Sequence, residues 1–285
     1  MRIFIAGGTG FLGSELSKKF KKKNNVLIGS RNKKSSFVFD LSSKKKPNKL
    51  IKFSPDIIIN CAALTDVDEC EKNKNKAYRT NKLITKKLVS VAKELNCKFI
   101  QISTDHVYDN SRNKNSEKNI KLTNYYSKSK RYSEKEALKY NKSLILRTNF
   151  FGFSKFRKSN LDWFFKSINK KVVVSLFNDV YFSPIYIKTL CEILNKVSKK
   201  KIYGIFNVGS IDAISKKDFY ILMSKKLNLE LKFKSIKIDS IIKNSNFVKR
   251  PKLMAMNVNK FQKYFKIKLP KISREIQKFR HEYKN

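Results

Sequence analysis

The sequence predicts an α/β fold: a doubly wound, parallel, Rossmann-type sheet joined to a smaller C-terminal α/β lobe. Three observations carry this prediction. Short apolar segments alternate with helical stretches through the first half of the chain, a glycine-rich turn follows the first segment, and the alternation ends near residue 150. We therefore expect an NAD(P)-binding domain over residues 1–150 and a mainly substrate-binding lobe over 151–285, with a chain that can cross between them.

The first half contains the regular alternation. Residues 2–6 are expected to form the first strand and residues 11–22 the first helix, because Phe11, Leu12, Leu16 and Phe20 share one helical face. Further strands are expected over 26–29, 37–39, 56–60, 98–103 and 143–147, and helices over 75–95 and 125–140. Residues 57–59 are three isoleucines, which is typical of a strand buried on both faces.

The second half has a less regular pattern. Helices are expected over 163–168, 184–197 and 216–227 and in the stretch from residue 257 onward, and strands over 172–176 and 204–208. The stretch contains neither an internal repeat nor a long linker, so we expect it to form one lobe.

The composition limits the class of protein. The formal net charge is +43, but lysine is spread along the whole chain, so we expect no specific nucleic-acid partner and instead a positive field that attracts anionic cofactors and substrates. No apolar run approaches the ~18 residues of a membrane span, and residues 1–6 enter the first strand without a signal-peptide pattern. Four cysteines without CxxC spacing fit reduced thiols, so a cytoplasmic protein is expected.

A glycine-rich loop lies between the first strand and the first helix. Gly7, Gly10 and Gly13 give the spacing GxxGxxG, and the chain has only eight glycines in total. Such glycines allow a tight turn, a close approach of the backbone to a pyrophosphate, and close packing of helix and strand. Because the helix N-terminus then presents free N–H groups to the phosphates, the loop predicts a dinucleotide site.

The residues after the second strand bear on the choice of cofactor. An acidic residue there would bind the ribose hydroxyls of NAD, whereas an arginine would accommodate the 2′-phosphate of NADP. The sequence at 29–34 is GSRNKK and contains no acid, and Arg31 is the candidate phosphate contact. We therefore expect NADPH, with NADH as the alternative.

Three polar residues form the candidate catalytic centre. Tyr126 and Lys130 lie four residues apart and share a helical face, and a neighbouring ammonium favours the phenolate and suits the tyrosine to proton transfer. Thr104 is expected at the carboxyl end of the fifth strand, where open α/β sheets bind their ligands. With only two histidines, His106 and His281, a Ser-His-Asp triad or a histidine-rich metal site is excluded, and no metal is expected.

Several motifs in order resemble those of the extended short-chain dehydrogenase/reductase superfamily and, within it, the dTDP-4-dehydrorhamnose reductase family. They are GGTGFLG at 7–13, NCAALTDVDECE at 60–71, ISTDHVYDN at 102–110 and YYSKSKRYSE at 125–134. The similarity continues through ILRTNFFG at 145–152, FSPIYI at 182–187, GIFNVGS at 204–210 and KRPKLMAMNVNKF at 249–261. It therefore covers nearly the whole chain.

The resemblance implies reduction of the C4 keto group of a nucleotide-activated sugar, with roles for particular residues. Tyr126 would donate the proton, Lys130 would hold the nicotinamide ribose and tune Tyr126, and Thr104 would bind the reacting oxygen. The implied cofactor contacts, besides Tyr126 and Lys130, are Gly7, Gly10, Phe11, Leu12, Gly13, Arg31, Asp40, Leu41, Ala62 and Ala63. The implied substrate contacts are Thr65, Val67, Thr104, Asp105, His106, Phe150 and Arg250.

The resemblance leaves alternatives open. The family usually has tyrosine where this chain has His106 and often has tryptophan where it has Phe150, so the particular sugar is undecided. An epimerase or dehydratase of the same superfamily is one rival, and a non-catalytic subunit resembling the regulatory subunit of methionine adenosyltransferase is another. A homodimer is a possible assembly, and no membrane partner is expected.

Overall fold

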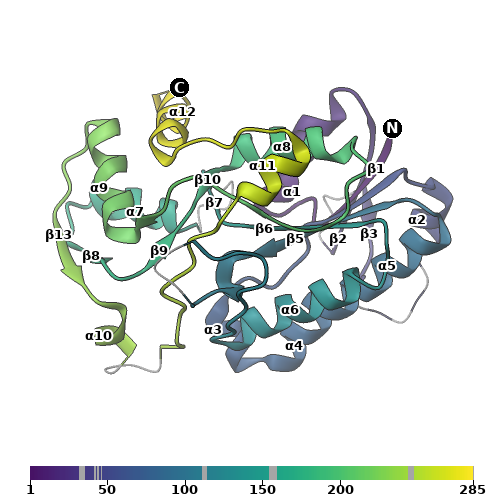
Figure 1. The fold of residues 1–285 in the computed structure, drawn as a ribbon, viewed down its shortest axis with the longest axis horizontal. Coiled ribbons are helices and arrows are strands. Elements are labelled where there is room, and N and C mark those ends of the chain that lie inside the picture. The colour runs from purple at the N-terminus through teal and green to yellow at the C-terminus, as the bar shows by residue number, and fades with distance from the viewer. Residues whose placement is uncertain are drawn as a thin grey trace. The chain divides into compact units, whose positions relative to one another are not determined.

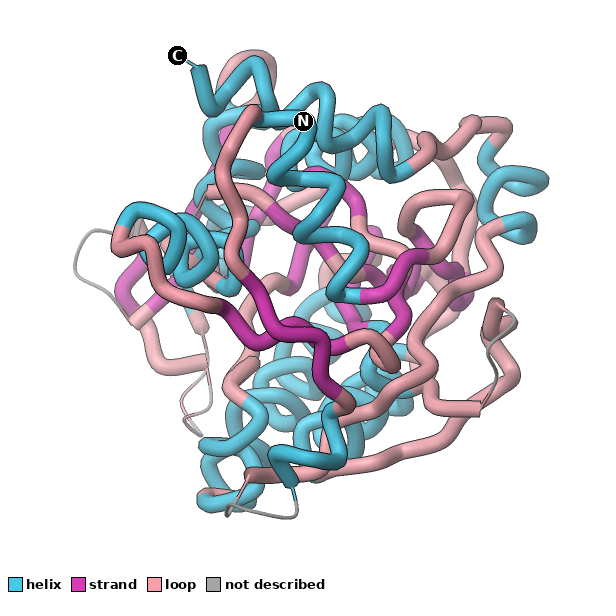
Figure 2. Tube along the Cα trace, turned by 90° about the vertical axis from the view of Figure 1, so that its left-hand side faces the viewer, coloured by secondary structure: helices cyan, strands magenta, loops and turns pink. Residues whose placement is uncertain are grey.

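The computed structural model describes residues 1–31, 36–41, 43, 45, 47–110, 114–153, 159–242 and 247–284. Residues 32–34, which enter the argument about cofactor choice, lie outside the described residues. Figure 1 shows the fold, and Figure 2 shows its helices in cyan and its strands in magenta. The chain divides into two compact units, each made of three segments. The first contains 1–104, 124–147 and 191–206, and the second contains 105–123, 148–190 and 207–285.

A seven-stranded sheet organises the first unit. Its strand order is β3-β2-β1-β4-β5-β6-β11, which is the Rossmann order, and this confirms the predicted parallel α/β fold. β4 lies beside β1 in parallel register, with Ile58 opposite Phe4, and all four β4 side chains are buried. The strands are β1 (Arg2–Ala6), β2 (Asn25–Ser30), β3 (Phe37–Val38), β4 (Ile57–Asn60), β5 (Lys98–Thr104), β6 (Ser143–Thr148) and β11 (Gly204–Val208).

Helices pack on both faces of this sheet. Figure 1 shows α5 (Ile84–Glu94) and α6 (Tyr125–Ala137) on one side and α1 (Phe11–Lys21) on the other. Apolar side chains of α5 and of the strands form a buried core, which includes Leu88 and Phe99. The remaining helices of the first unit are α2 (Asn48–Phe53), α3 (Val67–Lys72), α4 (Lys74–Tyr78) and, from residue 191 on, α8 (Ile187–Ser198).

One sequence-based expectation needs correction and another needs a detail added. The helix expected over 75–95 is present without a break from residue 74 to residue 94, but its middle, η1 (Arg79–Leu83), is a π-helical turn between α4 and α5. The Ile84 N–H bonds there to the carbonyl of Arg79, five residues back. The segment 204–208 was expected to be part of the second lobe, but as β11 it lies at the edge of the main sheet beside β6. The other expected elements are present, with ends that differ by a few residues.

The second unit contains three small two-stranded sheets and several helices. β7 (Phe150–Phe151) pairs with β10 (Ile185–Tyr186), β9 (Tyr181–Phe182) with β12 (Ile214–Ser215), and β8 (Val174–Phe177) with β13 (Phe233–Ile236). Stacked and edge-on aromatic rings fill its core, Phe151 meeting both Phe219 and Phe279. Its helices are η2 (Asp105–Val107), α7 (Asn160–Asn169), α9 (Lys216–Leu227), α10 (Ile238–Ile242), α11 (Asn259–Phe265) and α12 (Ile272–Lys284). That the first 150 residues bind cofactor and the remainder mainly substrate stays a prediction.

Candidate active site

The glycine loop between β1 and α1 is closely packed against its own backbone and the chain after β4. Gly7 has a φ of 70° and donates its N–H to the carbonyl of Gly29 at 2.8 Å. A Cβ atom on Gly7 would lie 2.7 Å from the backbone nitrogen of Ala62, and one on Gly13 would lie 2.2 Å from the carbonyl oxygen of Gly7. Neither position can hold a larger residue, because its Cβ would meet the chain's own backbone, so these glycines permit the tight turn and close packing typical of a dinucleotide-binding loop.

The first turn of α1 adds the electrostatic part of this surface. Gly10 is the N-cap residue in extended conformation, and within the described chain no side chain caps this helix end. The N–H groups that open the helix and the positive end of the helix dipole favour an anion there. Leu12 is buried beneath the turn, whereas Phe11 is half-buried.

Two of the predicted cofactor residues after β2 and β3 lie at the surface of the first unit, and the third is buried. Arg31 directly follows β2, and its side chain is exposed. Asp40, two residues beyond β3, is also exposed, while Leu41 is 4% exposed and belongs to the apolar core. Arg31 is therefore accessible to a ligand.

Buried amides hold the chain segment that follows β4. Asn81 in the π turn accepts the N–H of Leu64 at 2.7 Å and donates its own amide to the Leu64 carbonyl at 3.1 Å and to Ser129 Oγ on α6 at 2.7 Å. Asn60 accepts the N–H of Ala62 at 3.1 Å. Ala62 and Ala63, two predicted cofactor contacts, therefore lie on a segment that is fixed from both β4 and η1.

The predicted catalytic residues lie where α6 packs on β5. Tyr126 and Lys130 are one turn apart and are 7% and 4% exposed, and Thr104, the last residue of β5, is 5% exposed. Lys130 Nζ donates to the carbonyl oxygen of Ile102 at 2.8 Å. Asn124 begins the helix with a capping box, which fixes the first turn that contains Tyr126.

Burial changes the proton affinities around Lys130. It lowers the pKa of Lys130 to about 8, although the negative charge of Glu134 acts in the opposite direction. Burial also raises the pKa of the thiols of Cys61 and Cys70 to about 12, so both thiols are neutral near pH 8. Lys130 therefore keeps its charge at neutral pH but lies close to deprotonation.

The remaining predicted substrate residues are divided between the units. In the first unit, Thr65 is exposed and Val67 is 9% exposed at the start of α3. In the second unit, Asp105 is fully buried and accepts a hydrogen bond from Asn149 Nδ2 at 2.8 Å. Phe150 is half-buried in β7.

His106 and Arg250 belong to a charged group in the second unit that also includes Lys216. Burial, with the positive charges of Lys216 and Arg250, lowers the pKa of His106 to about 3, so its imidazole is neutral. Burial lowers the pKa of Lys216, against the opposing charge of Asp105. The Arg250 guanidinium lies 4.5 Å from the centre of the Phe247 ring.

Sequence reasoning did not single out several residues of these groups. Lys216 is one lysine among many, and its position at the start of α9 gave no signal. Asn81 gave no sequence signal either, because an asparagine inside a predicted helix is ordinary. Glu134 did give a sequence signal, since it repeats the four-residue spacing of Tyr126 and Lys130.

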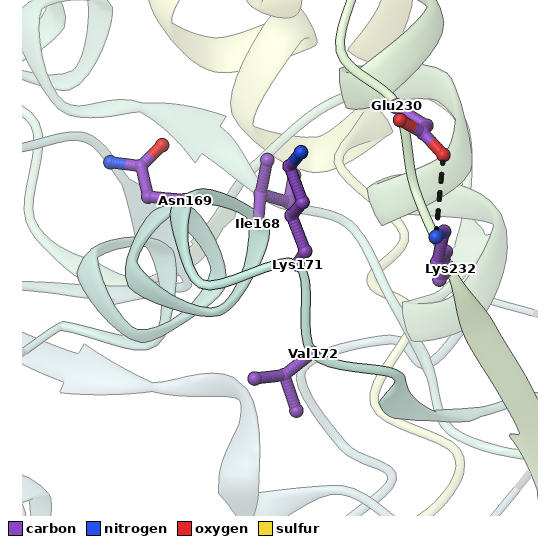
Figure 3. A pocket seen from close by; sticks show the side chains of 6 residues that line it. All are labelled: Ile168, Asn169, Lys171, Val172, Glu230 and Lys232. Carbon is purple, nitrogen blue, oxygen red and sulfur yellow. Dashed lines mark ion pairs between the residues drawn. The ribbon is translucent and has the colours of Figure 1, made fainter.

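A pocket lies elsewhere in the second unit. It is lined by the end of α7 with Lys171 and Val172, and by Glu230 and Lys232 ahead of β13 (Figure 3). Glu230 and Lys232 form an exposed ion pair at 3.8 Å. None of the predicted site residues lines this pocket, so it is separate from the candidate active site.

Two further observations concern only the described part of the chain. It contains no group of three histidine, cysteine or acidic side chains arranged to hold a metal ion. None of its helices combines the length and the apolar character needed to cross a bilayer.

The chain resembles known proteins in both sequence and fold. The family model described as the RmlD substrate binding domain matches residues 1–285. The dTDP-4-dehydrorhamnose reductase of Aggregatibacter actinomycetemcomitans is 25% identical over 98% of both chains. A crystal structure of dTDP-4-dehydrorhamnose reductase from Bacillus anthracis in complex with NADP has a TM-score of 0.90 at 22% identity, covering 99% of both chains.

A second type of enzyme has the same fold. A variant of the UDP-glucuronic acid 4-epimerase from Bacillus cereus, solved in complex with NAD and UDP-4-deoxy-4-fluoro-glucuronic acid, has a TM-score of 0.83 at 19% identity. The alignment covers 99% of this chain and all of the epimerase chain. Likeness of fold alone therefore does not separate reduction from epimerisation.

Proposed function

The chain belongs to the family of the RmlD substrate binding domain, and from this premise we propose that it reduces the C4 keto group of a nucleotide-activated sugar with NADPH, as a dTDP-4-dehydrorhamnose reductase does. The observation that carries the proposal is the position of Tyr126 and Lys130. Both are buried on one face of α6, next to the carboxyl end of β5 where Thr104 lies. The glycine loop belongs to the same unit.

The chain offers a fitting surface for the cofactor. Gly7 and Gly13, where a Cβ atom would meet the chain's own backbone, allow the tight turn, and this turn together with the positive end of α1 suits the pyrophosphate. Exposed Arg31 suits the 2′-phosphate of NADPH, and the fixed segment with Ala62 and Ala63 would contact the cofactor. The remaining assigned contacts are Gly10, Phe11, Leu12, Asp40, Leu41, Tyr126 and Lys130.

Proton transfer is assigned to Tyr126. NADPH, when bound, would supply hydride chemistry at the C4 carbon. The phenol of Tyr126 would give its proton to the C4 oxygen, so that the ketone would become an alcohol. The Lys130 ammonium, held by the Ile102 carbonyl, favours the phenolate that remains. Thr104 would hydrogen-bond the reacting oxygen and thereby orient the carbonyl.

The assigned substrate contacts are Thr65, Val67, Asp105, His106, Phe150 and Arg250. Because its imidazole is neutral, His106 would act as a hydrogen-bonding group rather than as a cation. His106 and Phe150 replace the aromatic residues usual in the family, so they would set which sugar is accepted.

The net charge, the location in the cell and the assembly complete the proposal. A nucleotide-sugar substrate and NADPH are small and anionic, so the +43 charge would attract them without a nucleic-acid partner. We propose a cytoplasmic location and a homodimer as the assembly.

The test measures oxidation of NADPH by the purified protein with several 4-keto nucleotide sugars. One NADPH consumed per alcohol formed supports reduction. An epimerase or dehydratase would convert the sugar without net NADPH consumption, and this result would contradict the proposal. Tyr126→Phe is the matched control, because it keeps the ring and removes only the hydroxyl.

A further inference from the structure

Glu134 is a fully buried carboxylate on the catalytic face of α6. It follows Tyr126 by eight residues and Lys130 by four, so all three side chains lie on one side of the helix. Its side chain has no exposed surface. Burying a charge of this kind costs several kcal/mol unless partners compensate for the lost water.

Three side chains provide that compensation. Arg147, on β6 and also fully buried, donates from Nε to Oε1 at 2.8 Å and from Nη2 to Oε2 at 2.7 Å. Ser103 Oγ on β5 donates to Oε1 at 2.6 Å, and Arg131 Nη1 donates to Oε2 at 2.8 Å. Burial alone would raise the pKa of Glu134, but these bonds and above all the Arg147 guanidinium hold it below its ordinary value, so Glu134 is ionised.

The Glu134 contacts lie next to the contact made by Lys130. Lys130 binds the carbonyl of Ile102, and Glu134 binds the hydroxyl of Ser103, the next residue of β5. The helix is therefore attached to β5 at two consecutive residues and to β6 through Arg147. A sliding or rotation of α6 would break all of these bonds together, which fixes the positions of Tyr126 and Lys130 relative to the sheet.

The charge of Glu134 also acts on Lys130. Among the groups that act on Lys130, the Cys61 thiol after β4 and the Cys70 thiol of α3 are neutral near pH 8, whereas Glu134 is negative. Other charged groups around α6 have partners of their own. Glu71 of α3 accepts the N–H of Tyr125, and Lys82 of η1 lies 3.8 Å from Glu136.

We propose that Glu134 is a positioning residue for the reduction: with Arg147 it holds α6 in register on the sheet, and its negative charge keeps Lys130 in the ammonium form. The inference rests on the proposed function of Tyr126 and Lys130. A buried ion pair that served only packing could be replaced by apolar side chains of similar volume at little cost or with a gain in stability. The two roles can therefore be separated.

The experiment measures the affinity of the protein for NADPH, by the fluorescence of the cofactor, between about pH 6 and 10. This range is centred on the pKa of about 8 to which burial lowers Lys130. Where a substrate is found, kcat is measured as well. In Glu134→Gln the pH above which NADPH binding weakens should fall by about one unit, because the carboxylate no longer favours the ammonium. We also expect kcat to fall about tenfold, because a loosened helix places Tyr126 less accurately.

A double variant guards against a trivial loss of folding, since Glu134→Gln leaves Arg147 buried without its partner. Glu134→Leu with Arg147→Met removes both charges and should fold with a Tm at or above that of the parent protein. It should still show the lowered pH limit, because Lys130 has again lost the carboxylate. A folded double variant with the parent pH limit would overturn the proposal.

Glu136→Gln is the matched control. Glu136 is also a buried carboxylate of α6, 6% exposed, but it pairs with Lys139 at 2.9 Å and not with the sheet. In Glu136→Gln, the pH above which NADPH binding weakens should equal that of the parent protein. A shift of this pH as large as that in Glu134→Gln would count against a specific role for Glu134. A parent protein that binds no NADPH at any pH would instead contradict the proposed function.

Discussion

Tyr126 is the residue whose loss should affect turnover most selectively. Tyr126→Phe keeps the buried ring and removes the proton donor, so folding and NADPH affinity should persist. General acid catalysis contributes ~10²–10⁴-fold, and kcat should fall by that order in an assay of NADPH oxidation. Tyr125→Phe is the control, because Tyr125 is half-buried and points ~100° away around the helix. Full activity of Tyr126→Phe together with an inactive Tyr125→Phe would show that the assigned register is wrong.

Lys130 should impose an alkaline limit on cofactor use. Burial lowers its pKa to about 8, so the ammonium is present below that pH and is lost as the pH rises through it. The kcat/KM for NADPH, which reports the free enzyme, should therefore decline above about pH 8. Lys130→Met should weaken both NADPH binding and turnover, and its residual binding should lack this decline. If kcat/KM for NADPH declined above the same pH in Lys130→Met, the decline would have to come from another titrating group.

Arg31 should decide between the two nicotinamide cofactors. Its exposed guanidinium follows β2, where an acid would favour NADH. In Arg31→Ala the KM for NADPH should rise about tenfold or more, as expected for a lost charge-assisted contact, while the KM for NADH stays nearly constant. Steady-state kinetics with both cofactors measure this, and equal effects on the two would exclude contact with the 2′-phosphate.

At the residue scale, the sequence could indicate chemical type but not environment. The spacing of Tyr126 and Lys130 predicted a shared face of one helix, and both side chains do lie buried on α6. The neutral state of His106 depends on burial beside Lys216 and Arg250, which are far from it in sequence. Such a group assembles only in the folded chain.

At the scale of elements, hydrophobic periodicity predicted most helices and strands but not the π turn. Residues 75–95 have a helical pattern throughout, yet the middle of the helix is the π turn η1, where Asn81 binds the chain after β4. A hydrogen-bond partner 17 residues away leaves no periodic signal in the local sequence. Unusual turns of this type often occur at functional sites.

Asn81 gives this element a testable role. Asn81→Ala removes the partner of the part-buried Leu64 N–H and one of the two donors to the Leu64 carbonyl, the other being the Cys70 thiol, so stability should fall by about 1–3 kcal/mol. Because the segment with Ala62 and Ala63 then loosens, the KM for NADPH should rise more than kcat falls. Asn75→Ala, at an exposed position of α4, is the control. A loss of stability without any change in KM would restrict Asn81 to a structural role.

At the scale of the whole chain, the sequence predicted the fold class but not the path of the chain. The glycine loop and the alternating strands indicated the parallel sheet, whose order is confirmed. Its last strand, β11, comes from residues 204–208 and follows much of the second unit in sequence. Periodicity identifies a strand without saying which sheet it joins, because pairing depends on long-range contacts.

The net charge leads to a prediction for the molecule as a whole. Basic residues number 65 and acidic residues 22, and both NADPH and a nucleotide sugar are anions. Steering by the summed field acts on encounter, so kcat/KM should fall steeply as salt rises from about 0.02 to 0.5 M, a range over which the screening length shrinks from roughly 20 Å to a few Å. The chemical step occurs among buried groups that salt screens much less, so kcat should change little over the same range. Measuring both constants across this series separates steering from a general effect of salt on the fold, which would lower kcat as well. A kcat/KM that does not depend on salt would show that the distributed lysines do not guide the substrates to the site.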